Sequence, residues 1–90
     1  MTQSKKLEGQ VALVTGGGGA IGGASAKILA RSGAKILVAD ERANMAKKIA
    51  SEIISEGNMA EPFEFDVAVP EQAKAAVKAA ESAFGGLNIL

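Results

Sequence analysis

The sequence predicts an α/β fold built on a parallel β-sheet. Short apolar runs alternate with amphipathic helical patterns along the whole chain, and glycines stand at most of the joins. Strands separated by a helix are connected by right-handed crossovers, so successive strands run parallel. At 90 residues, of which 48% are hydrophobic, the chain has room for one small domain with a packed core. No linker or repeat divides residues 1–90.

The first strand is predicted at 10–15 and the first helix at 20–31. Val11 and Leu13 suit a strand that is covered on both faces. Gly33 is expected to end the helix in a left-handed conformation. Four apolar residues share one face at helical spacing and are expected to point inward: Ile21, Ala24, Ile28 and Leu29.

The second strand is predicted at 35–39, with Asp40 at its carboxyl end. The helix that follows, at 43–55, ends near Gly57. Its inward face is predicted to consist of Ala46, Ile49, Ala50 and Ile53.

The third strand is predicted at 62–65 and the third helix at 71–84, with Pro70 in its first turn. The expected inward residues of this helix are Ala73, Ala76, Val77, Ala80 and Phe84. A pair of glycines is expected to end the helix, and residues 87–90 are predicted to begin a fourth strand that is cut short. The sheet is therefore expected to have an open apolar edge through which copies of the chain could associate.

The composition excludes several classes of function. Ten basic and ten acidic residues give a formal net charge of zero, which argues against nucleic acid and anionic membranes as partners. No apolar run reaches membrane-spanning length, and the polar residues 1–10 do not resemble a secretion signal. There is no cysteine or histidine, so no metal site is expected and a cytoplasmic location is favoured.

The join between the first strand and the first helix carries the strongest functional signal. Residues 16–24 read GGGGAIGGA, and Gly17, Gly19 and Gly22 satisfy the pattern G-x-G-x-x-G. The free N–H groups and the positive dipole end of a helix that starts here form an anion site suited to a pyrophosphate. A P-loop is excluded because no lysine follows the glycines. A flexible turn without a ligand is the alternative.

Asp40 follows Gly22 by 18 positions, close to the roughly 20 expected of the acid that binds the adenosine ribose. Its carboxylate can accept hydrogen bonds from both ribose hydroxyls and would repel a 2′-phosphate. Glu41 adds negative charge, so NAD is favoured over NADP. Arg42 could instead pair with a 2′-phosphate, although we interpret it as a solvated residue at a helix start. A turn or N-cap acid is the alternative role for Asp40.

Asp66 is predicted to lie at the end of the third strand, followed by Val67. At that edge of the sheet an Asp can accept a hydrogen bond from the adenine amino group, and Val67 can pack on the ring. A turn that precedes a helix is the alternative reading of this pair.

Residues 15–22, TGGGGAIG, resemble the signature T-G-x-x-x-[A/G]-x-G of classical short-chain dehydrogenases/reductases. The lead-in at 7–14, the segment at 65–67 and the approach to the fourth strand at 84–90 resemble the same family. The resemblance implies the N-terminal half of a Rossmann-type doubly wound parallel sheet that binds NAD. The cofactor-binding residues expected are Gly16, Gly18, Gly19, Ala20, Ile21, Gly22, Asp40, Glu41, Asp66 and Val67.

The sequence departs from the family pattern in two positions and lacks the catalytic elements. Ala20 stands for the commoner glycine, and Asn88 stands for an Asp. The family's Asn-Asn-Ala-Gly segment, catalytic Ser and Tyr-x-x-x-Lys pair follow its fourth strand, and this sequence has no tyrosine at all. No catalytic residue can be carried over.

The resemblance thus implies the ADP-binding portion of an oxidoreductase that transfers hydride between NAD and an alcohol or ketone. We expect this 90-residue portion to be truncated and inactive alone, and its parent to be a homo-oligomer. A non-catalytic nucleotide-binding module and a self-associating remnant are the alternatives.

Overall fold

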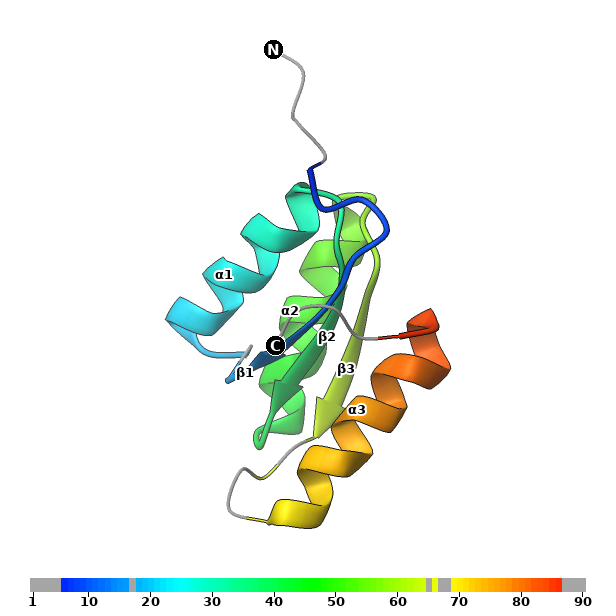
Figure 1. Cartoon of the computed structure of the whole chain (residues 1–90). Helices are drawn as coiled ribbons and strands as arrows, with labels where there is room; N and C mark the ends of the chain where they lie inside the picture. Colours follow the sequence, from blue (N-terminus) through cyan, green and yellow to red (C-terminus); the bar gives the residue numbers. More distant parts are fainter. Residues whose placement is uncertain (1–5, 17, 65, 67–68, 87–90) are drawn as a thin grey trace.

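A three-stranded parallel sheet in the order β1-β2-β3 organises the computed structural model, which describes residues 6–16, 18–64, 66 and 69–86. The elements alternate as predicted: β1 (Val11–Thr15), α1 (Ala20–Arg31), β2 (Lys35–Asp40), α2 (Ala43–Ser55), β3 (Ala60–Glu64) and α3 (Pro70–Phe84). Helices α1 and α2 cover one face of the sheet, and α3 covers the other (Figure 1). The α/β, doubly wound class predicted from the sequence is confirmed.

The register of the strands brings their carboxyl ends to one edge of the sheet. Thr15 lies opposite Ala39, and Asp40 lies opposite Glu64, so Asp40 extends one residue beyond the end of β1. Because side chains alternate along a strand, Asp40 shares the sheet face of Ile36 and Val38, which pack under α1 and α2. Asp40 is therefore directed to the side of the sheet from which α1 begins.

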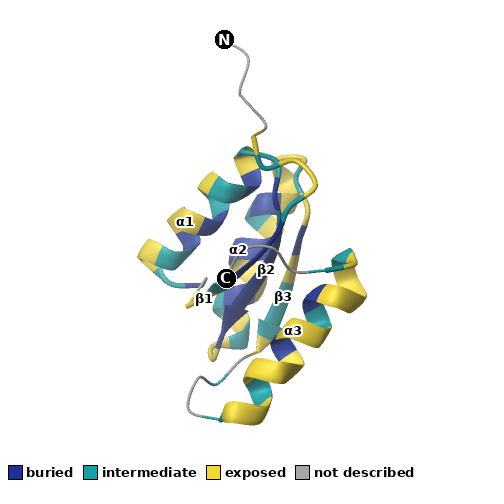
Figure 2. Cartoon of the chain, viewed as in Figure 1, coloured by how far each residue is buried: buried dark blue, intermediate teal, exposed yellow. Residues whose placement is uncertain are grey.

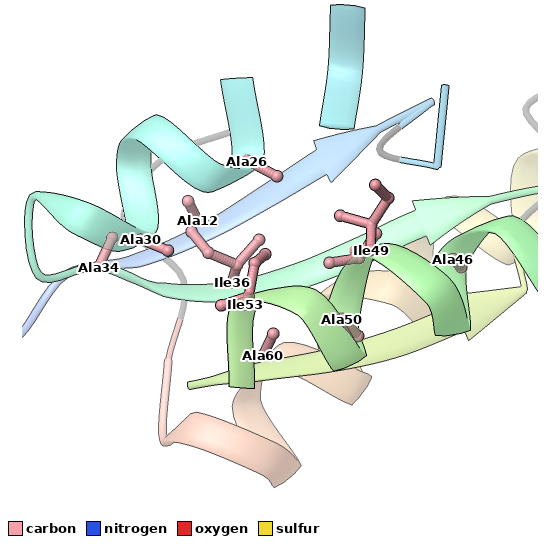
Figure 3. Close-up of a cluster of buried hydrophobic side chains, with 11 residues drawn as sticks. Ala12, Ala26, Ala30, Ala34, Ile36, Ala46, Ile49, Ala50, Ile53 and Ala60 are labelled. Carbon is pink, nitrogen blue, oxygen red and sulfur yellow. The ribbon is translucent and has the colours of Figure 1, made fainter. Parts of the chain in front are cut away.

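Helix α1 buries a different face from the one predicted. Its buried residues are Gly23, Ala26 and Ala30, whereas Ile21 is 85% and Ile28 is 60% exposed. Ala24 is also exposed, and Leu29 is only partly buried. Buried, intermediate and exposed stretches alternate along α1 (Figure 2). The small residues pack on Ala12 and Ile36 of the strands, which lets the helix lie close to the sheet (Figure 3).

The other two helices agree better with the prediction. The buried residues of α2 are the four expected: Ala46, Ile49, Ala50 and Ile53. In α3, Ala76 and Ala80 are buried and Phe84 is partly buried, but Ala73 and Val77 are exposed. That part of the α3 prediction is wrong, because the contact with the sheet follows the narrower stripe that also includes Ala79.

Most predicted boundaries hold within two residues. Strand β3 begins at Ala60, earlier than the predicted 62, because Ala60 pairs with Ile36 and Pro62 continues the strand opposite Val38. Proline is tolerated in a strand whose N–H side faces away from its partner, so Pro62 marks β3 as an edge strand. Gly33, Gly57 and Gly85 have the positive φ angles expected of residues that end helices. The predicted fourth strand, 87–90, lies outside the described residues.

Candidate functional site

The glycine-rich turn leads directly from β1 into α1. Gly16 has a φ of +66°, and Gly19 is the N-cap of α1 with its N–H bonded to the carbonyl of Gly16 at 3.0 Å. The N-cap makes no side-chain hydrogen bond, and the first turn of the helix contains no acidic residue. A helix start of this kind, with no side-chain cap and no acidic residue, can bind an anion through its N–H groups and the positive end of the helix dipole.

Gly18 fastens this turn to two other elements. It is buried, and a Cβ placed on it would lie 2.6 Å from Cβ of Met45 and 2.9 Å from the backbone nitrogen of Ala46, at the start of α2. Its N–H donates to Oδ2 of Asp40 at 3.1 Å. Only glycine allows this approach, so the turn has a fixed position relative to the ends of β2 and α2.

The Asp40 side chain is the main charged group of the site. The residue is 4% exposed, and its carboxylate accepts hydrogen bonds from Gly18 and from both the backbone and the guanidinium of Arg42. The Arg42 side chain lowers the pKa of Asp40 most, and the two backbone N–H groups lower it further; together these effects outweigh the opposing effect of burial. Asp40 is thus an ionised carboxylate at the edge of the sheet. The backbone N–H of Arg42 donates to the Asp40 carboxylate. Asp40 therefore also has the role of a turn acid, which the sequence offered as the alternative to ribose binding.

Arg42 is more than the solvated helix-start residue inferred from the sequence. It is the N-cap of α2, and its guanidinium pairs with Asp40 through Nε–Oδ1 at 3.1 Å and Nη2–Oδ2 at 3.3 Å. Its side chain is 59% exposed. The hydrogen bonds to Asp40 raise the pKa of Arg42. Sequence reasoning missed the pair, although a two-residue spacing between acid and Arg was a visible signal for it.

A cavity of about 640 Å³ lies beside this pair, at the carboxyl ends of β2 and β3. It is lined by Glu41, Arg42, Glu64, Asp66 and Gln72. Gln72, in the first turn of α3, accepts a hydrogen bond from the backbone N–H of Asp66 and so ties the end of β3 to that helix. Neither Glu64 nor Gln72 was predicted. Their roles depend on the strand register and the chain path after β3.

The predicted residues thus gather in two adjoining places. Gly18, Gly19 and Asp40 lie together around the glycine turn, while Glu41 and Asp66 line the adjoining cavity. Ala20 and Ile21 are exposed and Gly22 is half-buried, all in the first turn of α1. Gly17 and Val67 lie outside the described residues.

A second cavity, of about 520 Å³, lies between α1 and α2. Lys27 and Arg31 line it, and they make ion pairs with Glu52 and Glu56 that join the two helices. The pair Arg31–Glu56 is bidentate, at 3.2 and 3.0 Å. The cavity also reaches Gly18 and Gly19 of the glycine turn, whereas the Arg31–Glu56 pair joins the end of α1 to the C-cap of α2.

The described ranges lack two further features. No helix there combines the length and the apolar character that crossing a bilayer requires. The same residues contain no cluster of three or more acidic, histidine or cysteine side chains placed to hold a metal ion.

Comparisons with known proteins place the chain among oxidoreductases. The family model described as short chain dehydrogenase matches residues 10–90. Cyclohexanol dehydrogenase of Acinetobacter sp. (strain SE19) is 40% identical over 86 residues, which is 96% of this chain and 34% of that protein. The chain therefore spans about a third of the length of the curated relatives it matches.

Solved structures agree with this assignment. The hydroxysteroid dehydrogenase from Escherichia coli superposes with a TM-score of 0.92 and 31% identity, covering 96% of this chain and 37% of that one. A putative D-mannonate oxidoreductase from Haemophilus influenza, solved with bound NAD, superposes with a TM-score of 0.86 and 32% identity. That match covers 91% of this chain and 29% of the other.

Proposed function

The chain belongs to the short chain dehydrogenase family, and from this premise we propose that it forms the ADP-binding part of an NAD-dependent oxidoreductase. The observation that carries the proposal is the hydrogen bond from Gly18 to the buried carboxylate of Asp40. It joins the turn suited to a pyrophosphate to the acid suited to a ribose. These two groups are neighbours in an adenine dinucleotide.

The residues around that bond fit the cofactor in both shape and charge. The N–H groups of Ala20, Ile21 and Gly22 at the start of α1 would bind the pyrophosphate, in a turn kept clear of side chains by Gly16, Gly18 and Gly19. The adjoining cavity has the volume typical of a site for part of a small molecule. It would receive the adenine beside Asp66.

Asp40 and Glu41 would determine the choice between the two nicotinamide cofactors. The ionised Asp40 would accept hydrogen bonds from the ribose hydroxyls, and both acids would repel a 2′-phosphate. Gly19 offers the phosphate no cation from the turn. The bound NAD in a related oxidoreductase supports a nicotinamide cofactor for this chain.

When bound, the nicotinamide supplies hydride transfer, and the residues of this chain bind and orient the other half of the cofactor. The relatives named for cyclohexanol and for hydroxysteroids support an alcohol or ketone as the substrate of the whole protein. We propose that catalysis needs residues beyond these 90, because the chain has no tyrosine or histidine to transfer a proton. The cytoplasmic location and the homo-oligomeric parent stay predictions.

Titration of the 90-residue chain with NAD and NADP tests the choice of cofactor. We expect NAD to bind more tightly, and Asp40→Ala to weaken NAD roughly 10- to 100-fold, which is the effect of losing hydrogen bonds to a charged group. Because the same change removes the repulsion, NADP should lose less affinity than NAD. The exposed Glu81 on α3 provides the control, as Glu81→Ala should alter neither affinity. Equal or tighter binding of NADP by the unmodified chain would refute the NAD preference.

A further inference from the structure

The Asp40 carboxylate has no acceptor position left for a ligand. A carboxylate offers about four lone-pair sites. Four donors of the chain occupy them: Gly18 N–H at 3.1 Å, Arg42 N–H at 2.8 Å, Arg42 Nε at 3.1 Å and Arg42 Nη2 at 3.3 Å. A ribose that approaches this site would therefore find its hydrogen-bond partner already saturated.

Two of these four donors can leave without disturbing the fold. The N–H groups of Gly18 and Arg42 belong to backbone that packs against the first turn of α2. The guanidinium is instead at the end of a side chain that is 59% exposed, and its two bonds are not the shortest of the four. Displacing it requires only rotation of the Arg42 side chain into solvent.

Arg42 also lies between the glycine turn and the adjoining cavity. It lines the cavity at the ends of β2 and β3. On its other side it approaches the glycine turn, since a Cβ on Gly19 would lie 3.5 Å from Nη2. Arg42 thus fills the junction between the place suited to a pyrophosphate and the place suited to an adenine.

We propose that Arg42 is a specificity-determining residue whose guanidinium occupies the ribose-binding side of Asp40 in the empty site and is displaced by the ribose. This inference rests on the proposed function and adds to it the part that Arg42 plays. Displacement opposes binding of an unphosphorylated ribose. The released guanidinium remains two residues from Asp40 and can pair with a 2′-phosphate, which offsets the repulsion by Asp40 and Glu41. Arg42 therefore reduces the difference in affinity by which the site favours NAD over NADP.

Two ligands that differ only in the 2′-phosphate isolate this effect. Adenosine 5′-monophosphate and adenosine 2′,5′-bisphosphate share the 5′-phosphate, so the ratio of their Kd values reports on the 2′ position. NMR titrations of the 90-residue chain would give this ratio. For Arg42→Ala we expect the ratio of bisphosphate Kd to monophosphate Kd to rise about tenfold or more, the scale of one lost pairing with a charged group.

Two variants separate the effect of displacing the guanidinium from Asp40 from the effect of the positive charge at position 42. Arg42→Lys keeps the charge but loses the bidentate contact, so the monophosphate should bind more tightly than to the unmodified chain while the ratio changes less than threefold. Arg31→Ala removes the comparable arginine–carboxylate pair between α1 and α2 and should leave both Kd values unchanged. Unchanged positions of remote amide resonances would show that each variant is folded.

Displacement also has a direct signature in the unmodified chain. The Nε–H resonance of Arg42 should exchange slowly with water in the empty protein and rapidly once the monophosphate is bound. An Nε–H that stays protected in the complex would overturn the proposal, as would an unchanged ratio in Arg42→Ala. If neither nucleotide binds to the unmodified chain or to Arg42→Ala, the proposed function itself fails. Binding of the monophosphate with no dependence on Arg42 refutes only this inference.

Discussion

At the scale of single residues, the site is organised around a buried charge. Asp40 is the one charged residue that is buried among the described parts of the chain, and a buried charge is stable only when it is paired and hydrogen-bonded. Gly18 and Arg42 meet that requirement. The Gly18 bond also holds the glycine turn against the end of β2, so Asp40 contributes to the fold as well as to the candidate site.

The depressed pKa of Asp40 predicts a pH dependence of stability. A carboxyl whose folded pKa lies below its unfolded value of about 3.9 stabilises the fold above that value. This contribution is lost as the pH falls through the folded pKa. The unmodified chain should therefore exceed Asp40→Asn in unfolding free energy by about 1–3 kcal/mol at neutral pH, and by less below pH of about 4.

Urea unfolding of both proteins at neutral and acidic pH measures this difference. The other carboxylates are common to the two proteins, so their titration cancels in the comparison. A difference in unfolding free energy that stays constant across the range would show that the charge of Asp40 does not stabilise the fold.

At the scale of elements, α1 is the helix whose packing differs from the expected pattern. Its inward stripe of Gly23, Ala26 and Ala30 is small, and its large apolar residues Ile21 and Ile28 face solvent. Hydrophobic periodicity predicts that the larger side chains of α1 face the sheet. The short distance between α1 and the strands instead favours small side chains at the contact, because a close-packed interior leaves no room for extra methylene groups.

This packing predicts opposite outcomes for two substitutions in α1. Ala26→Ile should cost about 1–3 kcal/mol of unfolding free energy by overpacking the contact with Ala12 and Ile36. Ile28→Gln should change it by no more than about 0.5 kcal/mol, because the side chain is already exposed. Chemical denaturation monitored by circular dichroism gives both values. A larger cost for Ile28→Gln would support the face inferred from periodicity.

At the scale of the whole molecule, all the described site residues lie on one side of the fold. The parallel register places the ends of β2 and β3 together, and the turn after β1 lies beside them. Ligands of open α/β sheets bind outside the carboxyl ends of the strands. The chain corresponds to about a third of its relatives' length, and association through an open sheet edge stays a prediction.

We expect the purified 90-residue chain to show no dehydrogenase turnover with NAD and a panel of alcohols and ketones. The resemblance places the acid/base tyrosine and its lysine beyond these residues, and no tyrosine is present to replace it. Formation of reduced cofactor, followed by absorbance and compared with a no-enzyme control, measures this. Turnover that co-purifies with the intact mass of the chain would contradict it. An intact family member assayed alongside confirms that the conditions support catalysis.

The sequence by itself determined the order of the elements, the parallel sheet, the glycine turn and the place of Asp40 at a strand end. These features follow from periodicity, turn chemistry and spacing, which involve residues near one another in the chain. Only the tertiary structure decided that Ala26 rather than Ile28 faces the sheet, and that Glu64 and Gln72 adjoin Asp66. It also decided that Arg42 turns back onto Asp40. The packing of α1 depends on strands that lie far from it in sequence. Arg42 and Gln72 are close in sequence to their partners, but whether such neighbours meet depends on the path of the backbone, which periodicity does not encode.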